Sequence, residues 1–164
     1  MSLQLVPTSL ADPIGPALLL LGGMFALIAL AQMLIPYGLP VALETTKQAA
    51  APALEEARKN NWTMAVAIVD TAGNLVYFEK MDGTQTAIDK ARSAALFKRP
   101  TKAFQDTLAA GGEGLRVLGL QGAVPVEGGV PLVMDGKFVG AIGVSGGTSP
   151  QDSQCAKAGV DAVK

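Results

Sequence analysis

The residues of this sequence that could carry chemistry gather first around one predicted strand. Asp70 lies in the turn before it, Lys80 ends it, Asp82 follows it, and Lys90 and Arg92 lie in the next helical segment. Acidic and basic side chains in this order could converge on a polar pocket that binds a small charged ligand. Charged side chains also form solvated rims, so the sequence leaves both interpretations open.

A glycine-rich tract supplies a second group of candidate ligand-binding residues. Gly128 and Gly129 lie in one segment, and Gly143 and Ser145 lie in the next. Backbone N–H groups that glycines leave exposed can hold an anion. The spacing fits neither the phosphate loop nor the dinucleotide-binding fingerprint. The alternative role of these glycines is to let strand backbones turn sharply or pack closely.

The composition excludes several kinds of chemistry. The 164 residues include no histidine and one cysteine, Cys155. Ser-His-Asp and Cys-His mechanisms, disulfides within the chain and cysteine-built metal clusters are therefore ruled out. Haem iron could be ligated only by other side chains, for which Met81, Tyr77 and Cys155 are the candidates. We predict no metal site and no catalytic residues, because no paired nucleophile and base is visible.

The distribution of charge argues against nucleic acid and divides the chain in two. Thirteen Lys and Arg against 14 Asp and Glu give a net charge of −1, without the basic cluster that phosphate binding needs. All 13 basic residues lie from Lys47 onward, and the first 46 residues contain only Asp12 and Glu44 as charged residues. We therefore predict an N-terminal segment over 1–38 and a globular domain over 39–164.

The N-terminal segment contains an apolar run from Ala17 to Ile35 in which Gln32 is the only strongly polar residue. At about 1.5 Å per residue its length nearly matches a hydrocarbon core of about 30 Å. We predict a transmembrane helix that anchors the protein through large apolar side chains, namely Leu18, Leu19, Leu20, Leu21, Phe25, Leu27, Ile28 and Leu30. A signal peptide cleaved near Ala31 and a helix buried in a soluble oligomer are the alternatives.

The elements that must position the candidate residues follow from periodicity and turn signals. Asp135-Gly136 between two apolar runs is a strong hairpin signal, and Pro52 should bend or restart the first helix. Hairpins interrupted by helices indicate an α+β fold with an antiparallel sheet. The predicted helices cover 41–60, 87–97, 101–110 and the chain from 149 onward, and the predicted strands cover 64–69, 75–80, 130–134 and 138–144.

Several ordered motifs together resemble the GlcG/HbpS family, also called the haem-degrading domain family. The resemblance covers residues 39–164, the whole predicted globular part. The motifs are Val69-Asp70-Thr-Ala-Gly73, Lys80-Met-Asp-Gly83, Asp89-Lys-Ala-Arg-Ser-Ala94, Phe97-Lys-Arg-Pro-Thr101, Glu127-Gly-Gly-Val-Pro131, Gly140-Ala-Ile-Gly-Val-Ser-Gly146 and Gln151-Asp152.

The resemblance implies a profilin-like α+β fold, in which helices flank an antiparallel sheet, and assembly into dimers or larger oligomers. Members of the family include secreted haem-binding proteins, and many are periplasmic or extracellular. Two departures matter here. The sequence lacks the histidine associated with haem binding, and it has fewer residues between Gln85 and Ala87 than the family carries.

Three functions follow from the sequence, of which an enzyme of haem or small-acid metabolism, with Lys90 or Asp82 as its base, is the least favoured. The first is a non-catalytic module anchored in the cytoplasmic membrane, with its domain in the periplasm. Its partners would be lipid and membrane proteins, and it would act as an accessory subunit of a larger complex. The alternative is a periplasmic or secreted protein, cleaved near Ala31, that binds haem or another small ligand. The sequence fixes no cofactor, and the absence of histidine weakens the case for haem.

Overall fold

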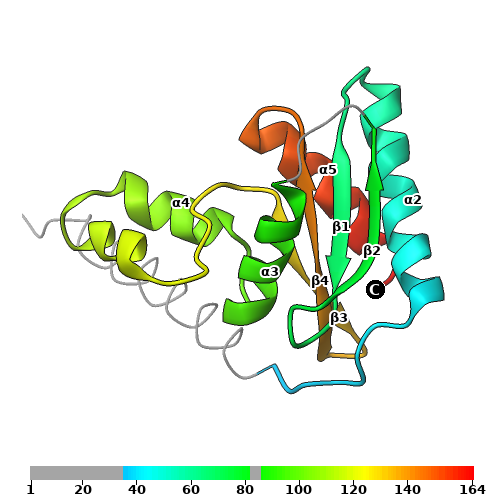
Figure 1. The fold of residues 1–164 in the computed structure, drawn as a ribbon, viewed down its shortest axis with the longest axis horizontal. Coiled ribbons are helices and arrows are strands. Elements are labelled where there is room, and N and C mark those ends of the chain that lie inside the picture. Colours follow the sequence, from blue (N-terminus) through cyan, green and yellow to red (C-terminus); the bar gives the residue numbers. More distant parts are fainter. Residues whose placement is uncertain (1–34, 82–85) are drawn as a thin grey trace, which may run out of the picture. The chain divides into compact units, whose positions relative to one another are not determined.

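The fold is built on a four-stranded antiparallel sheet with the strand order β2-β1-β4-β3 (Figure 1). The computed structural model describes residues 35–81 and 86–164. The predicted α+β class is confirmed, whereas the predicted anchor residues and Asp82 lie outside the described residues. The strands are β1 (Ala65–Val69), β2 (Leu75–Lys80), β3 (Gly129–Met134) and β4 (Lys137–Ser145).

Five helical segments accompany the sheet in the described part of the chain: α2 (Leu43–Lys59), α3 (Ala87–Phe97), α4 (Lys102–Ala109), the 3₁₀ helix η1 (Gly112–Gly119) and α5 (Ser149–Asp161). The sequence predicted all of them except η1, whose glycines indicated a loop. Pro52 does not interrupt α2, because the flanking Ala49 and Ala53 are fully buried and packing holds the helix together. None of these helices is long and apolar enough to span a membrane.

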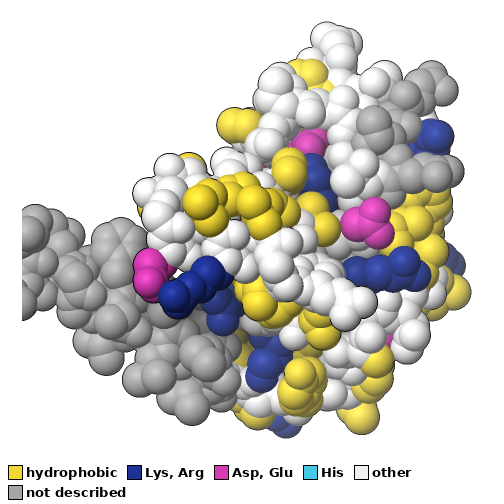
Figure 2. Space-filling model, turned by 60° about the vertical axis from the view of Figure 1, so that its left-hand side comes forward, with side chains coloured by type: hydrophobic (Ala, Val, Ile, Leu, Met, Phe, Trp, Pro, Cys, Tyr) yellow, Lys and Arg dark blue, Asp and Glu magenta, His cyan; other side chains and the backbone are white. Residues whose placement is uncertain are grey.

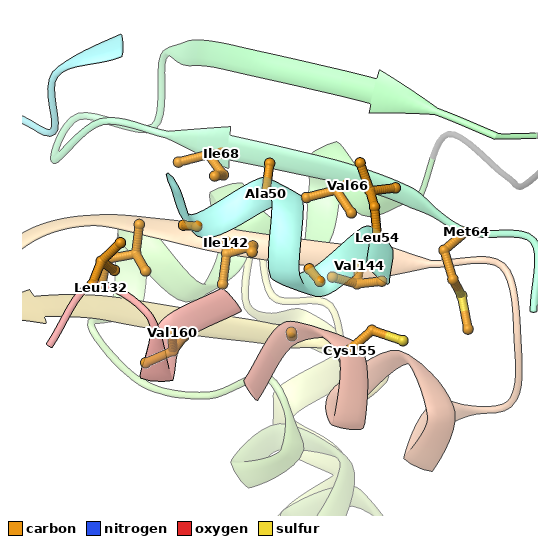
Figure 3. Packing of buried hydrophobic residues seen from close by; sticks show 14 of the residues in the cluster. Ala50, Leu54, Met64, Val66, Ile68, Leu132, Ile142, Val144, Cys155 and Val160 are labelled. Atoms are coloured by element: carbon orange, nitrogen blue, oxygen red, sulfur yellow. The ribbon is translucent and has the colours of Figure 1, made fainter. Parts of the chain in front are cut away.

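Helices α2 and α5 pack on one face of the sheet and enclose the larger core (Figure 3). Leu54 of α2, Ile142 of β4 and Cys155 of α5 point into this core together. The half-buried Trp62 packs against its edge. Burial of aliphatic side chains from α2, α5 and the sheet is the main force holding the domain together.

Helix α3 packs on the opposite face of the sheet through alanines, including Ala87 and Ala91, which meet Ala65 and Ala67 of β1. Small side chains allow a close approach of helix and sheet, and at Gly143 of β4 an added Cβ would lie only 2.1 Å from the carbonyl oxygen of Ala87. Because α3 contacts β1, β3 and β4, the edge strand β2 stays half-exposed. Helix α4 and η1 lie beyond α3, away from the sheet (Figure 1).

Candidate functional site

The most deeply buried charged residues in the described part of the chain are Lys90 of α3 and Asp152 of α5. Lys90 Nζ donates to Asp152 Oδ2 over 2.6 Å, and the two side chains are 2% and 3% exposed. The backbone N–H of Gly147 donates to the other carboxylate oxygen over 2.9 Å. The pair therefore ties α3, α5 and the turn after β4 together, and in this conformation neither charge faces solvent.

Gly128 and Gly129 pack directly against this ion pair, and neither position leaves room for a Cβ atom. A Cβ at Gly128, where φ is +123°, would lie 2.9 Å from Asp152 Cβ and 3.1 Å from Lys90 Nζ. A Cβ at Gly129 would lie 2.3 Å from the carbonyl oxygen of Lys90. The Gly129 N–H donates to the buried Thr101 hydroxyl over 3.0 Å. Close packing, the alternative role that the sequence left open, is what these glycines provide.

The structure brings four of the predicted ligand-binding residues close to this ion pair and separates others from it. Lys90 is itself a member of the pair, Gly128 and Gly129 pack against it, and the buried Ser145 ends β4 two residues before Gly147. Asp152 was missed as a site residue although it lies in one of the family motifs. A buried lysine requires a carboxylate partner, but the sequence alone cannot say which one.

Asp70 occupies the turn between β1 and β2 and organises that turn. Its carboxylate accepts hydrogen bonds from the backbone N–H groups of Ala72 and Asn74, over 2.8 and 2.9 Å, and from the Asn74 side chain. Partial burial by itself would raise the pKa of Asp70, but these hydrogen bonds together lower it below its usual value. This is the geometry of an Asx turn, so the described contacts of Asp70 are local.

Lys80 lies on a face of β2 that none of the described helices covers. In the register of β1 and β2, Leu75 pairs with Val69, Phe78 with Ala67 and Lys80 with Ala65. Paired residues point to the same face of a sheet, and the β1 partners Val69, Ala67 and Ala65 belong to the cluster that packs against α3. Leu75, Phe78 and Lys80 therefore point to that face as well. Leu75 is 42% exposed, Phe78 is half-buried and Lys80 is exposed, because α3 packs over the neighbouring strands.

Helix α3 borders this uncovered face. Its Ile88 is half-buried against the same alanine-rich cluster as Phe78, and the exposed Arg92 donates to the carbonyl oxygen of Gly73 over 3.4 Å. We use the name open β2 face for the set Leu75, Phe78, Lys80, Ile88 and Arg92. From Leu75 to Lys80 it extends about 16 Å, at about 3.3 Å per residue. It combines apolar side chains with a cation from each of its two elements.

The three candidate haem ligands point away from the open β2 face. Tyr77 and Met81 pack against the core on the α2 and α5 side, and the Tyr77 hydroxyl donates to Glu79 over 2.6 Å, which raises the pKa of Tyr77. Cys155 is fully buried in that core, and burial raises the pKa of its thiol to about 11. A neutral, buried thiol does not suit iron ligation, so these residues do not fit a haem iron bound at the open β2 face.

The described residues include no group of three or more histidine, cysteine, aspartate or glutamate side chains that could hold a metal ion. On the face seen in Figure 2, basic, acidic and apolar side chains are interspersed. This arrangement suits a small amphipathic ligand better than it suits a polyanion, which needs a field of one sign.

The fold and the site define a class of protein, namely an antiparallel α+β domain with a half-exposed edge strand. The sequence matches the family described as "Haem degrading protein HbpS-like" over residues 41–161. The chain therefore belongs to the HbpS-like family, and the resemblance that the motifs indicated is confirmed. The GlcG protein of Escherichia coli K12 is 41% identical over 96 residues, which are 56% of this chain and 70% of GlcG.

Solved structures agree with this assignment. The PduOC domain, described in complex with haem, superposes with a TM-score of 0.68 at 26% identity and covers 77% of this chain and 96% of its own. An HbpS double mutant from Streptomyces reticuli superposes with a TM-score of 0.67 at 28% identity, covering 77% of this chain and 89% of its own. The helix-flanked antiparallel sheet is thus shared with both proteins.

Proposed function

We propose that the protein is a non-catalytic ligand-binding member of the HbpS-like family, and that it takes a flat, apolar molecule with acidic groups at the open β2 face. One observation carries the proposal: Leu75 and Phe78 stay partly exposed on a sheet whose other strands are covered by helices. Flat apolar ligands gain binding free energy from such surfaces, and Lys80 and Arg92 can pair with acidic groups. Porphyrins are the test ligands because the family and the PduOC structure are both described by haem.

The proposal differs from haem binding through the iron. Tyr77, Met81 and Cys155 all pack against the other side of the sheet, so the open β2 face holds the ring and the acidic groups without an iron ligand from these residues. Protoporphyrin IX, which contains no metal, should then bind with nearly the same affinity as haem. Haem that is bound this way should also lack the absorption bands of iron ligated by thioether, phenolate or thiolate.

The experiment is a titration of the full chain with haem and with protoporphyrin IX, followed by absorption and by quenching of Trp62 fluorescence. Leu75→Ser should weaken both ligands about fivefold, because about 1 kcal/mol of apolar contact is lost. Arg92→Gln should weaken both ligands but not an esterified porphyrin. The matched controls are Leu118→Ser and Arg116→Gln, which change exposed residues of η1 and should leave binding unchanged.

Two results would count against this function. If haem bound far more tightly than protoporphyrin IX, an iron ligand would be present and the uncoordinated mode would be wrong. If neither ligand bound, or if the η1 controls lost as much affinity as the β2 variants, the open β2 face would not be the site.

We further propose that the protein is held at the cytoplasmic membrane through the run from Ala17 to Ile35, with its domain in the periplasm as an accessory subunit of a larger complex. The supporting observation is the uncharged sequence between Asp12 and Glu44. Alkaline carbonate extraction of native membranes tests it, since a spanning segment keeps the chain in the pellet. Release of the intact chain, or a mature protein that begins after Ala31, would favour the soluble ligand-binding alternative.

A further inference from the structure

The first described residues form a strap, Ile35–Val41, beside the beginning of β4 at the foot of the view in Figure 1. The strap is parallel to β4, and an isolated bridge pairs Tyr37 with Phe138. Three backbone hydrogen bonds of 2.8 Å hold it, from Phe138 to Pro36, from Gly38 to Phe138 and from Val41 to Val139. The pairing of β1 with β4 ends at Val69, which lies opposite Ala141. The strap continues the pairing along β4 at Phe138 and Val139.

Side-chain contacts hold the strap in addition to its backbone hydrogen bonds. The rings of Tyr37 and Phe138 pack edge to face with centroids 5.6 Å apart. Lys98, which ends α3, places Nζ 4.5 Å from the centre of the Tyr37 ring and donates to the carbonyl oxygen of Ile35 over 3.1 Å. Ile35 itself packs against the alanine-rich cluster below α3. Ile35, the first described residue, is therefore fixed on the domain.

Three large hydrophobic side chains on the strap and at the beginning of α2 are exposed. Leu39 is 87% exposed, Tyr37 is 58% exposed and Leu43 is 49% exposed. Beside them lies a surface pocket of about 410 Å³, which the strap and the β3–β4 hairpin line together and to which Lys137 contributes. We use the name strap face for Tyr37, Leu39, Leu43, Lys98 and Lys137.

We propose that the strap face lies in the interfacial layer of a lipid bilayer and fixes how the domain stands on it. Exposed leucines and a tyrosine flanked by lysines are the pattern of a bilayer interface, where lysine stems cross apolar surface and keep their ammonium groups in water. The continuity of the uncharged sequence supports a lipid bilayer as what the strap face contacts. The sequence without an acidic or basic side chain does not stop at the domain boundary but runs through the entire strap to Leu43. This inference rests on the proposed membrane attachment.

The charges on the strap face indicate that apolar contact, rather than anionic lipid, supplies the attraction. Asp135 lines the same pocket as Lys137, and Lys47 is paired with Glu44 over 2.9 Å. Positive and negative side chains thus nearly balance, so vesicles of phosphatidylcholine alone should suffice. Added phosphatidylglycerol should change the result little.

The test attaches an environment-sensitive fluorophore to the full chain at Leu39→Cys and, as a control, at Lys59→Cys. Lys59 is the exposed last residue of α2, about 24 Å along the helix from Leu43. Cys155 is fully buried and should not react, which labelling of the unsubstituted chain verifies. The labelled chains are reconstituted into phosphatidylcholine vesicles and recovered by flotation.

At position 39 we expect a blue shift, loss of quenching by iodide and quenching by lipids that carry a nitroxide near the headgroup. At position 59 iodide should quench and the lipid nitroxide should not. Equal behaviour of the two probes in floated vesicles would overturn the strap-face inference while leaving membrane attachment intact. Failure to float would remove both. The porphyrin titration would be affected by neither result.

Two other occupants of the strap face give different signals, and each would overturn the inference. If residues of the same chain covered it, position 39 would be shielded from iodide without lipid and would not respond to the lipid nitroxide. If a second copy covered it, the shielding would disappear on dilution of the protein in the absence of lipid. Removing exposed apolar area with Leu39→Ser should, in the bilayer case, restore iodide quenching of a probe at the neighbouring Leu43→Cys.

Discussion

Removing one partner of the buried Lys90–Asp152 pair should strongly destabilise the domain. Lys90→Met keeps most of the side-chain volume but leaves the Asp152 carboxylate with the Gly147 N–H as its remaining identified donor. The two side chains are 2% and 3% exposed, so water cannot replace the lost ammonium group without opening the structure. Breaking a buried pair in this way costs about 3–5 kcal/mol.

The measurement is urea unfolding of the full chain, followed by the fluorescence of Trp62, the only tryptophan in the sequence. Asp152→Asn should cost a similar amount because it leaves the ammonium group unpaired. The double variant Lys90→Met with Asp152→Asn should recover part of the loss, by an interaction free energy of about 1–3 kcal/mol, because no buried charge remains.

An exposed ion pair provides the matched control. Lys102 contacts Asp106 over 2.7 Å, nearly the 2.6 Å of the buried pair, but its side chain is 51% exposed. Lys102→Met should therefore cost less than about 1 kcal/mol. If Lys90→Met cost no more than Lys102→Met, or if the double variant showed no coupling, the argument from burial would be refuted.

Three further predictions concern packing and titration. Gly143→Ala should lower the free energy of unfolding by about 1–3 kcal/mol, because its Cβ would lie 2.1 Å from the backbone of α3. Gly119→Ala should change it little, because a Cβ there has nothing within 4 Å. Equal urea midpoints of the two variants would contradict this prediction. The pKa of the Cys155 thiol is raised from 9.0 to about 11, so at pH 8 the folded chain should hold about a hundredfold less thiolate than a thiol of ordinary pKa. Iodoacetamide should therefore label Cys155 only on unfolding. Fast labelling of the folded chain would show that the thiol is accessible. The lowered pKa of Asp70 stabilises the fold above about pH 4, and this stability is lost as the pH falls through the folded-state pKa. The difference in unfolding free energy between the natural chain and Asp70→Asn should therefore shrink in acid. A constant difference from pH 7 to pH 3 would count against this prediction.

Local patterns were sufficient to predict most secondary structure elements. The β3–β4 turn at Asp135-Gly136, the β1–β2 turn that Asp70 organises, and the beginning of α5 at Ser149-Pro150 depend on residues adjacent in sequence. Where a local rule failed, packing outweighed it. Pro52 remains inside α2 because the buried face of that helix contributes more free energy than one missing hydrogen bond.

The candidate site could be predicted only in part. Lys90, Gly128 and Gly129 were singled out by residue type, but the structure shows that Lys90 forms a closed ion pair with Asp152 and that the two glycines pack against it. Lys80 was also singled out, whereas the apolar partners that make its face a candidate binding surface were not. Leu75 and Phe78 resemble any other strand residues until the sheet order shows that β2 is an edge that α3 does not cover.

The sequence by itself determined which residue types this chain has for chemistry, the uncharged N-terminal run and the family, because these depend on composition and on motifs in a fixed order. Only the tertiary structure decided which charges neutralise each other, which face of the sheet stays open, and that the strap is fixed beside β4. The physical reason is that burial and pairing depend on contacts between residues far apart in the chain. Lys90 and Asp152 are separated by 62 positions, and only the fold brings their charges to 2.6 Å.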